Sequence, residues 1–126
     1  MRDPRPQLPW SKARLERRAV YGTWMASDAW QQRRRRWADT WASAHGQPPT
    51  CAACGGPWSI CHGDLHHRSY RHLGAEHHND LVALCRSCHH RLHQLIESTP
   101  AWRRLGRPRA TDTAIAVLRR HHLRQP

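Results

Sequence analysis

One short segment of the sequence, LVALCRSCHHRLHQ, carries an unusual density of side chains that can bind metal ions. Within nine consecutive positions the chain has Cys85, Cys88, His89, His90 and His93. A tetrahedral zinc ion accepts four ligands, so this segment and a second ligand pair together offer more than one ion can use. We therefore predict two metal sites that share this segment.

Four of the five cysteines form two Cys-x-x-Cys pairs, a spacing typical of a structural zinc site. Four thiolates complete the tetrahedral shell and leave no position for water or substrate. Disulfides are the alternative, but no apolar export signal precedes the pairs, so we expect a cytoplasmic protein. The predicted zinc ligands are Cys51, Cys54, Cys85 and Cys88. The remaining thiol, Cys61, is expected to be a small buried side chain in a strand.

The histidines indicate a second and more open metal site. On a helix, His89 and His93 lie one turn apart, on a stripe about 100° away from that of Cys88. They would need a third ligand from elsewhere and would leave positions for water and substrate. The earlier stretch LHHR supplies His66 and His67 as candidates.

The elements that position these ligands can be predicted from the neighbouring sequence. WSICHGDLHHRS favours two short strands joined by a two-residue turn at Gly63 and Asp64. DLVALCRSCHHRLHQLIES favours an extended segment followed by a helix that ends near Pro100. Neighbours on a regular strand face opposite sides, so His66 and His67 can reach one site only where the strand twists or ends.

A helical segment is predicted before this core. Between Lys12 and Ala44 the composition favours helix, and three tryptophans recur at i, i+7 and i+11 on one face. We expect this face, formed by Trp30, Trp37 and Trp41, to pack inward because it would otherwise expose a large apolar stripe.

A basic linker and a second helix are predicted after the core. RRLGRPRA is similar to the minor-groove core of an AT-hook, with Leu105 where that motif has Arg, and it is otherwise a basic linker. TDTAIAVLRRHH predicts a capped amphipathic helix with Ile115 and Leu118 on one face. This helix could dock on the domain, lie along DNA or pair with a second copy in a homodimer.

The charge of the chain indicates a polyanionic partner. The formal net charge is +12, from 21 Lys and Arg against 9 Asp and Glu, so DNA is the expected partner. No stretch reaches the roughly 18 apolar residues of a membrane span. Consecutive arginines wrap a helix, and such a run is also typical of a solvated face. The predicted phosphate contacts are Arg33, Arg34, Arg35, Arg36, Arg68 and Arg71.

Taken together, CAAC, DLHHRS and NDLVALCRSCHHRLH resemble the HNH endonucleases of the ββα-metal fold, in the subgroup with a four-Cys structural zinc. The stretch WMASDAWQQRRRRW is similar to the helix that often precedes the first Cys pair in stand-alone members. The resemblance covers roughly Trp24 to Ile96. It implies a small α+β protein with a ββα-metal core and zinc knuckles, between a Trp- and Arg-rich helix and a C-terminal helix.

The expected organisation has four parts. Residues 1–11 form a disordered basic arm, and residues 12–47 form the N-terminal helical segment. Residues 48–99 form the nuclease core, and residues 100–126 contain the basic linker and the C-terminal helix.

The resemblance also implies roles for the histidines. His66, His89 and His93 would bind one catalytic divalent metal, and His89 and His93 match the family's His-x-x-x-His, which colicin nuclease domains share. His67 would be the general base that takes a proton from water, giving 5'-phosphate and 3'-hydroxyl products. The metal stays open among Mg²⁺, Mn²⁺, Ni²⁺ and Zn²⁺, although three imidazoles favour the last three. His90 is expected on the surface.

The middle position of the motif departs from the family pattern. Relatives commonly have Asn five residues before the second Cys pair, where this chain has Asp80, with Asn79 one residue earlier. An ionised carboxylate only accepts hydrogen bonds, so Asp80 could hold the loop that carries the base or orient His67 through its ring N–H. If it faces His67, its charge would raise the pKa of that imidazole. We take Asp80 rather than Asn79 as the functional equivalent.

The sequence therefore predicts a metal-dependent HNH endonuclease that hydrolyses DNA phosphodiester bonds. The alternative is a zinc-knuckle protein that binds DNA or regulates without catalysis. Cleavage of a plasmid in the presence of a divalent metal separates the two.

Overall fold

The computed structural model describes residues 11–124, and the residues of the predicted basic arm before Ser11 lie outside this range. The elements, in chain order, are α1 (Lys12–Met25), α2 (Asp28–His45), β1 (Gly63–His67), the 3-10 turn η1 (His78–Asp80), β2 (Leu81–Cys85), α3 (Arg86–Ser98), α4 (Pro100–Arg103) and α5 (Arg107–Leu123). The predicted small α+β class is confirmed.

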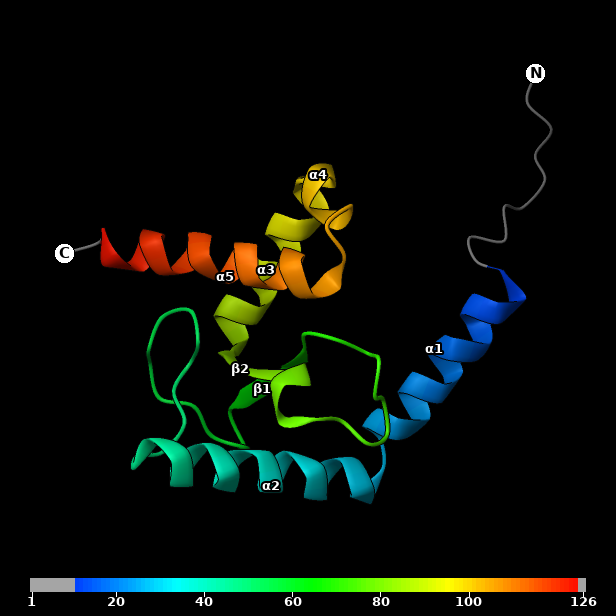
Figure 1. Cartoon of the computed structure of the whole chain (residues 1–126), viewed down its shortest axis with the longest axis horizontal. Helices are drawn as coiled ribbons and strands as arrows, with labels where there is room; N and C mark the ends of the chain where they lie inside the picture. Colours follow the sequence, from blue (N-terminus) through cyan, green and yellow to red (C-terminus); the bar gives the residue numbers. More distant parts are fainter. Residues whose placement is uncertain (1–10, 125–126) are drawn as a thin grey trace.

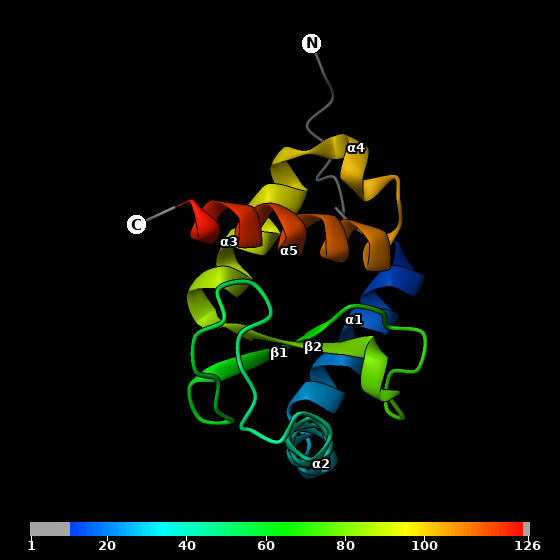
Figure 2. The ribbon, with the colours of Figure 1, turned by 60° about the vertical axis from the view of Figure 1, so that its left-hand side comes forward.

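Two antiparallel strands form the centre of the molecule. β1 pairs with β2 in a register that sets His66 opposite Val82 and His67 opposite Leu81. The strands lie between α2 on one side and α3 and α5 on the other, in both views of the ribbon (Figure 1, Figure 2). Because both faces of this small sheet are covered, β1 has buried side chains on both of its faces.

The face toward α2 is packed with indole rings and small apolar side chains. Its buried residues are Trp30, Trp37, Trp58, Leu65, Leu81 and Ala83. Trp41 is half-buried against the same cluster, so the prediction that the three spaced tryptophans of α2 pack inward is confirmed. Large rings at these positions compensate for the absence of Phe in the chain.

The face toward α3 and α5 has a second cluster that includes two of the cysteines. Its buried residues are Cys51, Ala53, Leu84, Cys88, Leu92, Ala114, Ile115 and Leu118. Ile115 and Leu118 of α5 belong to the same cluster as Leu92 of α3. α5 therefore docks on the domain, the first of the three arrangements considered for this helix. α3 ends at Ser98, close to the predicted stop at Pro100.

The N-terminal helical segment consists of two helices rather than one. α1 ends at Met25, and Ser27 caps α2, because its Oγ accepts a hydrogen bond from the Trp30 backbone N–H at 3.1 Å. α2 then ends at His45, and its C-cap residue Gly46 adopts a left-handed conformation with φ of 68°. The break turns α1 away from α2 (Figure 1). The Tyr21 ring of α1 lies edge-on to His67, the last residue of β1, with 5.9 Å between the ring centroids.

The predicted two-residue turn at Gly63 and Asp64 is wrong. Gly63 is the first residue of β1, and the partner strand is β2, which follows a long connection over residues 68–80. Gly63 is needed because the Trp58 indole lies directly against its Cα, where a Cβ would overlap the ring. Cys61, expected in a strand and buried, is exposed in the turn before β1.

Gly63→Ala is expected to lower the free energy of unfolding by about 1 to 3 kcal/mol, because the added methyl group must displace the Trp58 ring. Urea unfolding followed by tryptophan fluorescence measures the change. Gly22→Ala is the matched control: it lies in α1 with open space around it, and we expect a gain of up to about 1 kcal/mol from helix propensity. Equal effects of the two substitutions would contradict the role given to the close approach at Gly63.

The C-terminal helix is confirmed but begins earlier than predicted. Gly106, with φ of 86°, caps the start of α5, and Arg107 and Pro108 lie in its first turn, so the Gly-Arg-Pro stretch is the start of a helix rather than an extended AT-hook segment. Thr111, the first residue of the stretch predicted as a capped helix, is inside α5 and fully buried. None of the helices in residues 11–124 is long and apolar enough to cross a lipid bilayer.

Candidate metal centres and active site

The four paired cysteines come together as one cluster. Their sulfur atoms all lie within 4.8 Å of one another, and Cys54 Sγ is 3.9 Å from Cys85 Sγ. A tetrahedral shell with Zn–S bonds of about 2.3 Å requires sulfur atoms about 3.8 Å apart. The cluster Cys51, Cys54, Cys85 and Cys88 could therefore hold a zinc ion.

Backbone N–H groups surround these sulfur atoms. Cys51 Sγ accepts from Cys54 N at 3.5 Å, Cys54 Sγ from Gly56 N at 3.4 Å, and Cys85 Sγ from Cys88 N at 3.4 Å. Burial raises the pKa of the Cys51 thiol, but its backbone hydrogen bonds outweigh this and leave the pKa lowered. The surroundings therefore favour the thiolate at Cys51, whereas burial raises the pKa of the Cys54 and Cys88 thiols, so a bound zinc ion would have to stabilise those two as thiolates.

The Cys51→Ala, Cys85→Ala double variant is expected to lose one zinc ion per chain and to unfold, because zinc binding supplies folding free energy in small domains. Elemental analysis and circular dichroism measure the two losses. Cys61→Ala is the matched control, since Cys61 is exposed and outside the cluster, and it should keep its zinc. A folded double variant with full zinc content would refute the assignment.

The second predicted site also comes together. His66, His89 and His93 each offer a ring nitrogen within 4.8 Å of the others. His66 Nδ1 lies 3.2 Å from His89 Nε2, which lies 3.0 Å from His93 Nε2. Nitrogen ligands at about 2.1 Å from one ion are about 3.0 to 3.4 Å apart in octahedral or tetrahedral geometry, which these two separations match, so the cluster could hold a metal ion.

The outer nitrogens of two of these rings have partners that fix their orientation. Thr111 Oγ1 lies 2.9 Å from His66 Nε2, and Asp64 Oδ2 lies 2.9 Å from His89 Nδ1. Metal-binding histidines commonly have such a second partner, which fixes the tautomer and makes the other nitrogen available to the metal. This pattern supports the assignment of His66 Nδ1 and His89 Nε2 as the inward donors.

Burial favours the neutral form of two of these imidazoles, His66 and His93. Burial, followed by the charge of Arg107 and the neighbouring histidines, lowers the pKa of His66 to about 2. Burial and the neighbouring His89 also lower the pKa of His93. Neutral imidazole is the form that binds a metal ion, so the surroundings of the cluster favour ligation at neutral pH.

His66 and His67 lie on opposite faces of β1, as the alternation of a strand requires, yet both line one cavity of about 260 Å³. Four consecutive residues of β1, 64 to 67, line this cavity, so it runs along an edge of the strand rather than over one face. The other edge pairs with β2. An opening along the unpaired edge thus resolves how two adjacent histidines can serve one site.

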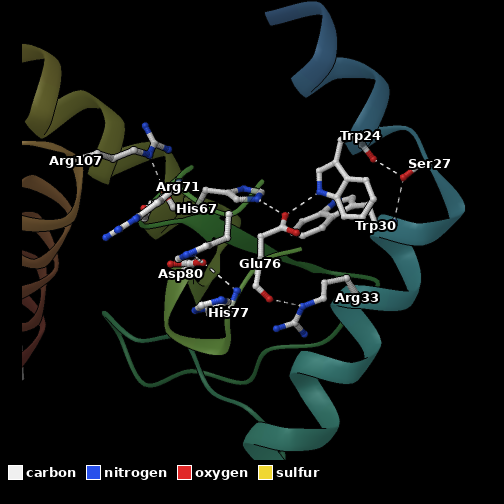
Figure 3. A network of polar contacts seen from close by, with 12 residues as sticks. Trp24, Ser27, Trp30, Arg33, His67, Arg71, Glu76, His77, Asp80 and Arg107 are labelled. Carbon is white, nitrogen blue, oxygen red and sulfur yellow. Dashed lines mark hydrogen bonds and ion pairs between the residues drawn. The ribbon is translucent and has the colours of Figure 1, made fainter. Parts of the chain in front are cut away.

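The acidic partner of His67 is Glu76, from the connection between the two strands (Figure 3). Glu76 Oε2 lies 2.7 Å from His67 Nε2 and also accepts a 2.7 Å hydrogen bond from Trp24 Nε1 in α1. The Glu76 side chain is completely buried and is absent from the lining of the cavity. Arg33 supports the same residue by donating to its backbone carbonyl.

This contact assigns the tautomer of His67. A carboxylate only accepts hydrogen bonds, so Nε2 of the neutral ring carries the hydrogen and Nδ1 is left as the proton acceptor. The ring is held between Trp30 and Tyr70, with centroids at 4.9 and 5.2 Å. Burial lowers the pKa of His67 and outweighs the opposing effect of Glu76, which is opposite to the rise expected had Asp80 faced the ring.

Asp80 holds the loop rather than the His67 ring. Its carboxylate Oδ2 accepts from the His77 backbone N–H at 2.9 Å and lies 2.8 Å from His72 Nδ1. Its backbone carbonyl accepts from the Arg68 N–H, directly after β1. Of the two roles considered for Asp80, its contacts are those of holding the loop, and the contact that would orient the His67 ring is made by Glu76 instead.

Asn79 is exposed and lines a different and larger cavity of about 720 Å³, between α2, the first Cys pair and α5. It does not line the cavity with the histidines. The preference for Asp80 over Asn79 in cleavage stays a prediction. His90 is exposed on α3, where it was expected.

The arginines predicted to contact DNA fall into two groups. Three are engaged within the protein: Arg33 with Glu76, Arg34 with the Ile60 and Gly63 carbonyls, and Arg68 with both carboxylate oxygens of Asp112. The others are exposed: Arg35, Arg36 and Arg71. A run of four arginines therefore has two that tie α2 to the core and two that face solvent.

Several residues of the site were missed from the sequence. Asp64 lies two positions before His66 on the same strand face, and this spacing could have identified it. Glu76 is the only acidic residue between β1 and η1, which was a weaker signal. Thr111 and Arg107 come from α5, and no local pattern connects that helix with the histidines.

Comparisons of the chain with protein-family models, with curated proteins and with solved structures each returned no match. Function is therefore inferred from the residues themselves and from their geometry.

Proposed function

We propose that this chain is a metal-dependent endonuclease of the HNH type that hydrolyses phosphodiester bonds in DNA. The observation that carries this proposal is the shared cavity. A buried His67 with a defined proton-accepting nitrogen and the three-histidine cluster line the same space of about 260 Å³. Hydrolysis needs a base and a site for the reacting phosphate in one place, and this cavity brings the residues for both together.

The chain order supports the ββα-metal fold as part of this proposal. The candidate base and one candidate ligand lie at the end of β1, and the other two ligands lie on α3, directly after β2. The antiparallel pair and the helix thus supply the residues that the resemblance assigns to strand and helix. The four-Cys cluster joins the loop before β1 to the start of α3, so a zinc ion there would fix the helix relative to the strands.

In the proposed reaction, His67 Nδ1 takes a proton from a water molecule in the cavity as that water attacks phosphorus. The bond from phosphorus to the 3' oxygen breaks, and the leaving oxygen takes a proton from solvent. Glu76 keeps the proton on Nε2 and stabilises the imidazolium that forms. Trp30 and Tyr70 restrict the ring to one orientation. His66, His89 and His93 would hold the divalent metal, which when bound acts as a Lewis acid on the phosphate and the leaving oxygen.

DNA is proposed as the substrate because of the charge of the chain. The net charge of +12 and exposed arginines on α2 and in the connection after β1 favour a polyanion. A zinc-knuckle protein without catalysis would share this charge and the four-Cys cluster. It would have no use for a completely buried carboxylate on His67, and this contact favours the enzyme.

A labelled DNA duplex tests the proposal. We expect cleavage in the presence of a divalent metal, with 5'-phosphate and 3'-hydroxyl ends on the fragments, as the resemblance implies. The ends are identified by whether a ligase rejoins the fragments. Intact duplex in every metal, with the protein folded and bound to the DNA, would favour the zinc-knuckle alternative.

A further inference from the structure

Arg107 places a half-buried positive charge in the cavity of the proposed active site. It comes from the first turn of α5 and lines the cavity together with His66, His67, His89 and His93. Its Nε donates a 2.6 Å hydrogen bond to the His67 carbonyl, and its guanidinium carbon lies 4.2 Å from the centre of the Tyr70 ring. These contacts fix the side chain but do not neutralise its charge.

Within residues 11–124, no carboxylate lies within ion-pairing distance of Arg107, and its two terminal nitrogens donate to no protein acceptor. The nearby acids have other partners: Asp64 faces His89, Glu76 faces His67, and Asp112 pairs with Arg68. Burial lowers the pKa of Arg107, which reflects the cost of placing this charge away from water. A charge held partly away from water without a counter-ion is unfavourable, and an anion bound beside it removes this cost.

We propose that the two terminal nitrogens of Arg107 bind the oxygens of one phosphodiester group of the DNA in this cavity. The guanidinium fork matches two phosphate oxygens, and it is presented beside both the candidate base and the candidate metal ligands. Because Nε holds the carbonyl of His67, the same side chain sets the bound phosphate relative to the base. This inference rests on the proposed function and gives α5 a direct role in the site.

The test measures DNA affinity with hydrolysis blocked. A fluorescent duplex is titrated with the His67→Ala protein, with and without Arg107→Gln, over a series of salt concentrations. Gln keeps a neutral donor for the His67 carbonyl and removes the charge. We expect the affinity to fall about 10- to 100-fold, as for loss of charge-assisted hydrogen bonds. The slope of log K against log salt should become less negative by about 0.9, the value for one phosphate contact.

Arg91→Gln is the matched control, because Arg91 is exposed on α3 and does not line the cavity. It removes the same charge and should change neither quantity by a comparable amount. Unchanged affinity and slope for Arg107→Gln, or equal losses for both variants, would overturn the inference. If Arg107→Gln does not fold, Arg107→Lys is used instead: it keeps the charge and the slope but should still lose affinity several-fold, and unaltered affinity would overturn the inference.

The outcome for Arg107 can be distinguished from the outcome for the proposed nuclease function. Loss of affinity in Arg107→Gln, together with a wild-type protein that never cleaves DNA, would leave a phosphate site in a binding protein. Cleavage by the wild type with unchanged affinity in the variant would remove only the role of Arg107.

Discussion

Replacing His67 with alanine is expected to reduce the rate of DNA cleavage by about 10² to 10⁴, the usual effect of losing a general base. The reason is that His67 lines the cavity and that its contact with Glu76 through Nε2 leaves Nδ1 as the nitrogen that can accept a proton. Cleavage is measured in single turnover with saturating protein, so that the rate reports the chemical step. The content of both metals and the affinity for DNA should stay close to the wild-type values.

His90→Ala is the control for His67→Ala, because His90 is exposed on α3 and belongs to neither the four-Cys cluster nor the three-histidine cluster. It should cleave at the wild-type rate. His89→Ala provides the contrast, since loss of a candidate ligand should reduce metal content together with activity. If His67→Ala cleaved as fast as the wild type, the assignment of the base would be wrong.

The second large effect is expected for Glu76→Gln, with cleavage reduced by about 10²-fold or more. The substitution keeps the size of the side chain, but an amide can donate to His67 Nε2. The hydrogen of the neutral ring would then move to Nδ1, the atom that must accept a proton from water. Glu76 thus acts as a positioning residue, and its loss should lower the single-turnover rate while DNA affinity stays unchanged.

Glu97→Gln is the matched control for this substitution, since Glu97 is exposed on α3. Nitrogen NMR of the His67 ring separates a tautomer change from simple destabilisation: in the wild type the hydrogen should be on Nε2, and in Glu76→Gln it should be redistributed to Nδ1. A wild-type rate in Glu76→Gln, with the hydrogen still on Nε2, would show that the carboxylate has no part in positioning the base.

The local patterns of the sequence were sufficient to predict most of the elements. The spaced tryptophans predicted the inward face of α2. The spacing of the second Cys pair and of the histidines predicted α3, with Cys88 on one side of the helix and His89 and His93 on a neighbouring side. The turn at Gly63 was wrong because a glycine required by close packing against Trp58 has the same appearance in the sequence as one required by a turn. The break between α1 and α2 depends on a single cap, Ser27, within a composition that favours helix throughout.

Only those residues of the site that are close together in the sequence, or that recur at a recognisable spacing, could be predicted. The two metal-binding groups followed from Cys-x-x-Cys and His-x-x-x-His, and the structure brings each group together. Glu76, Thr111 and Arg107 reach the histidines only through the folded chain, by the loop over residues 68–80 and by the docking of α5. Contacts between distant segments of this kind leave no periodic signal in a single sequence.

Relaxation of supercoiled plasmid is the measurement that tests the central claim most directly. The purified chain is incubated with plasmid and Mg²⁺, Mn²⁺, Ni²⁺ or Zn²⁺ in separate reactions, and the fractions of supercoiled, open-circular and linear DNA are followed with time. The account predicts conversion to open-circular or linear DNA in at least one of these metals and not in their absence, with His67→Ala inactive under the same conditions. Plasmid that stays supercoiled in all four metals, with a folded protein that retains its zinc, would contradict the proposal of a nuclease.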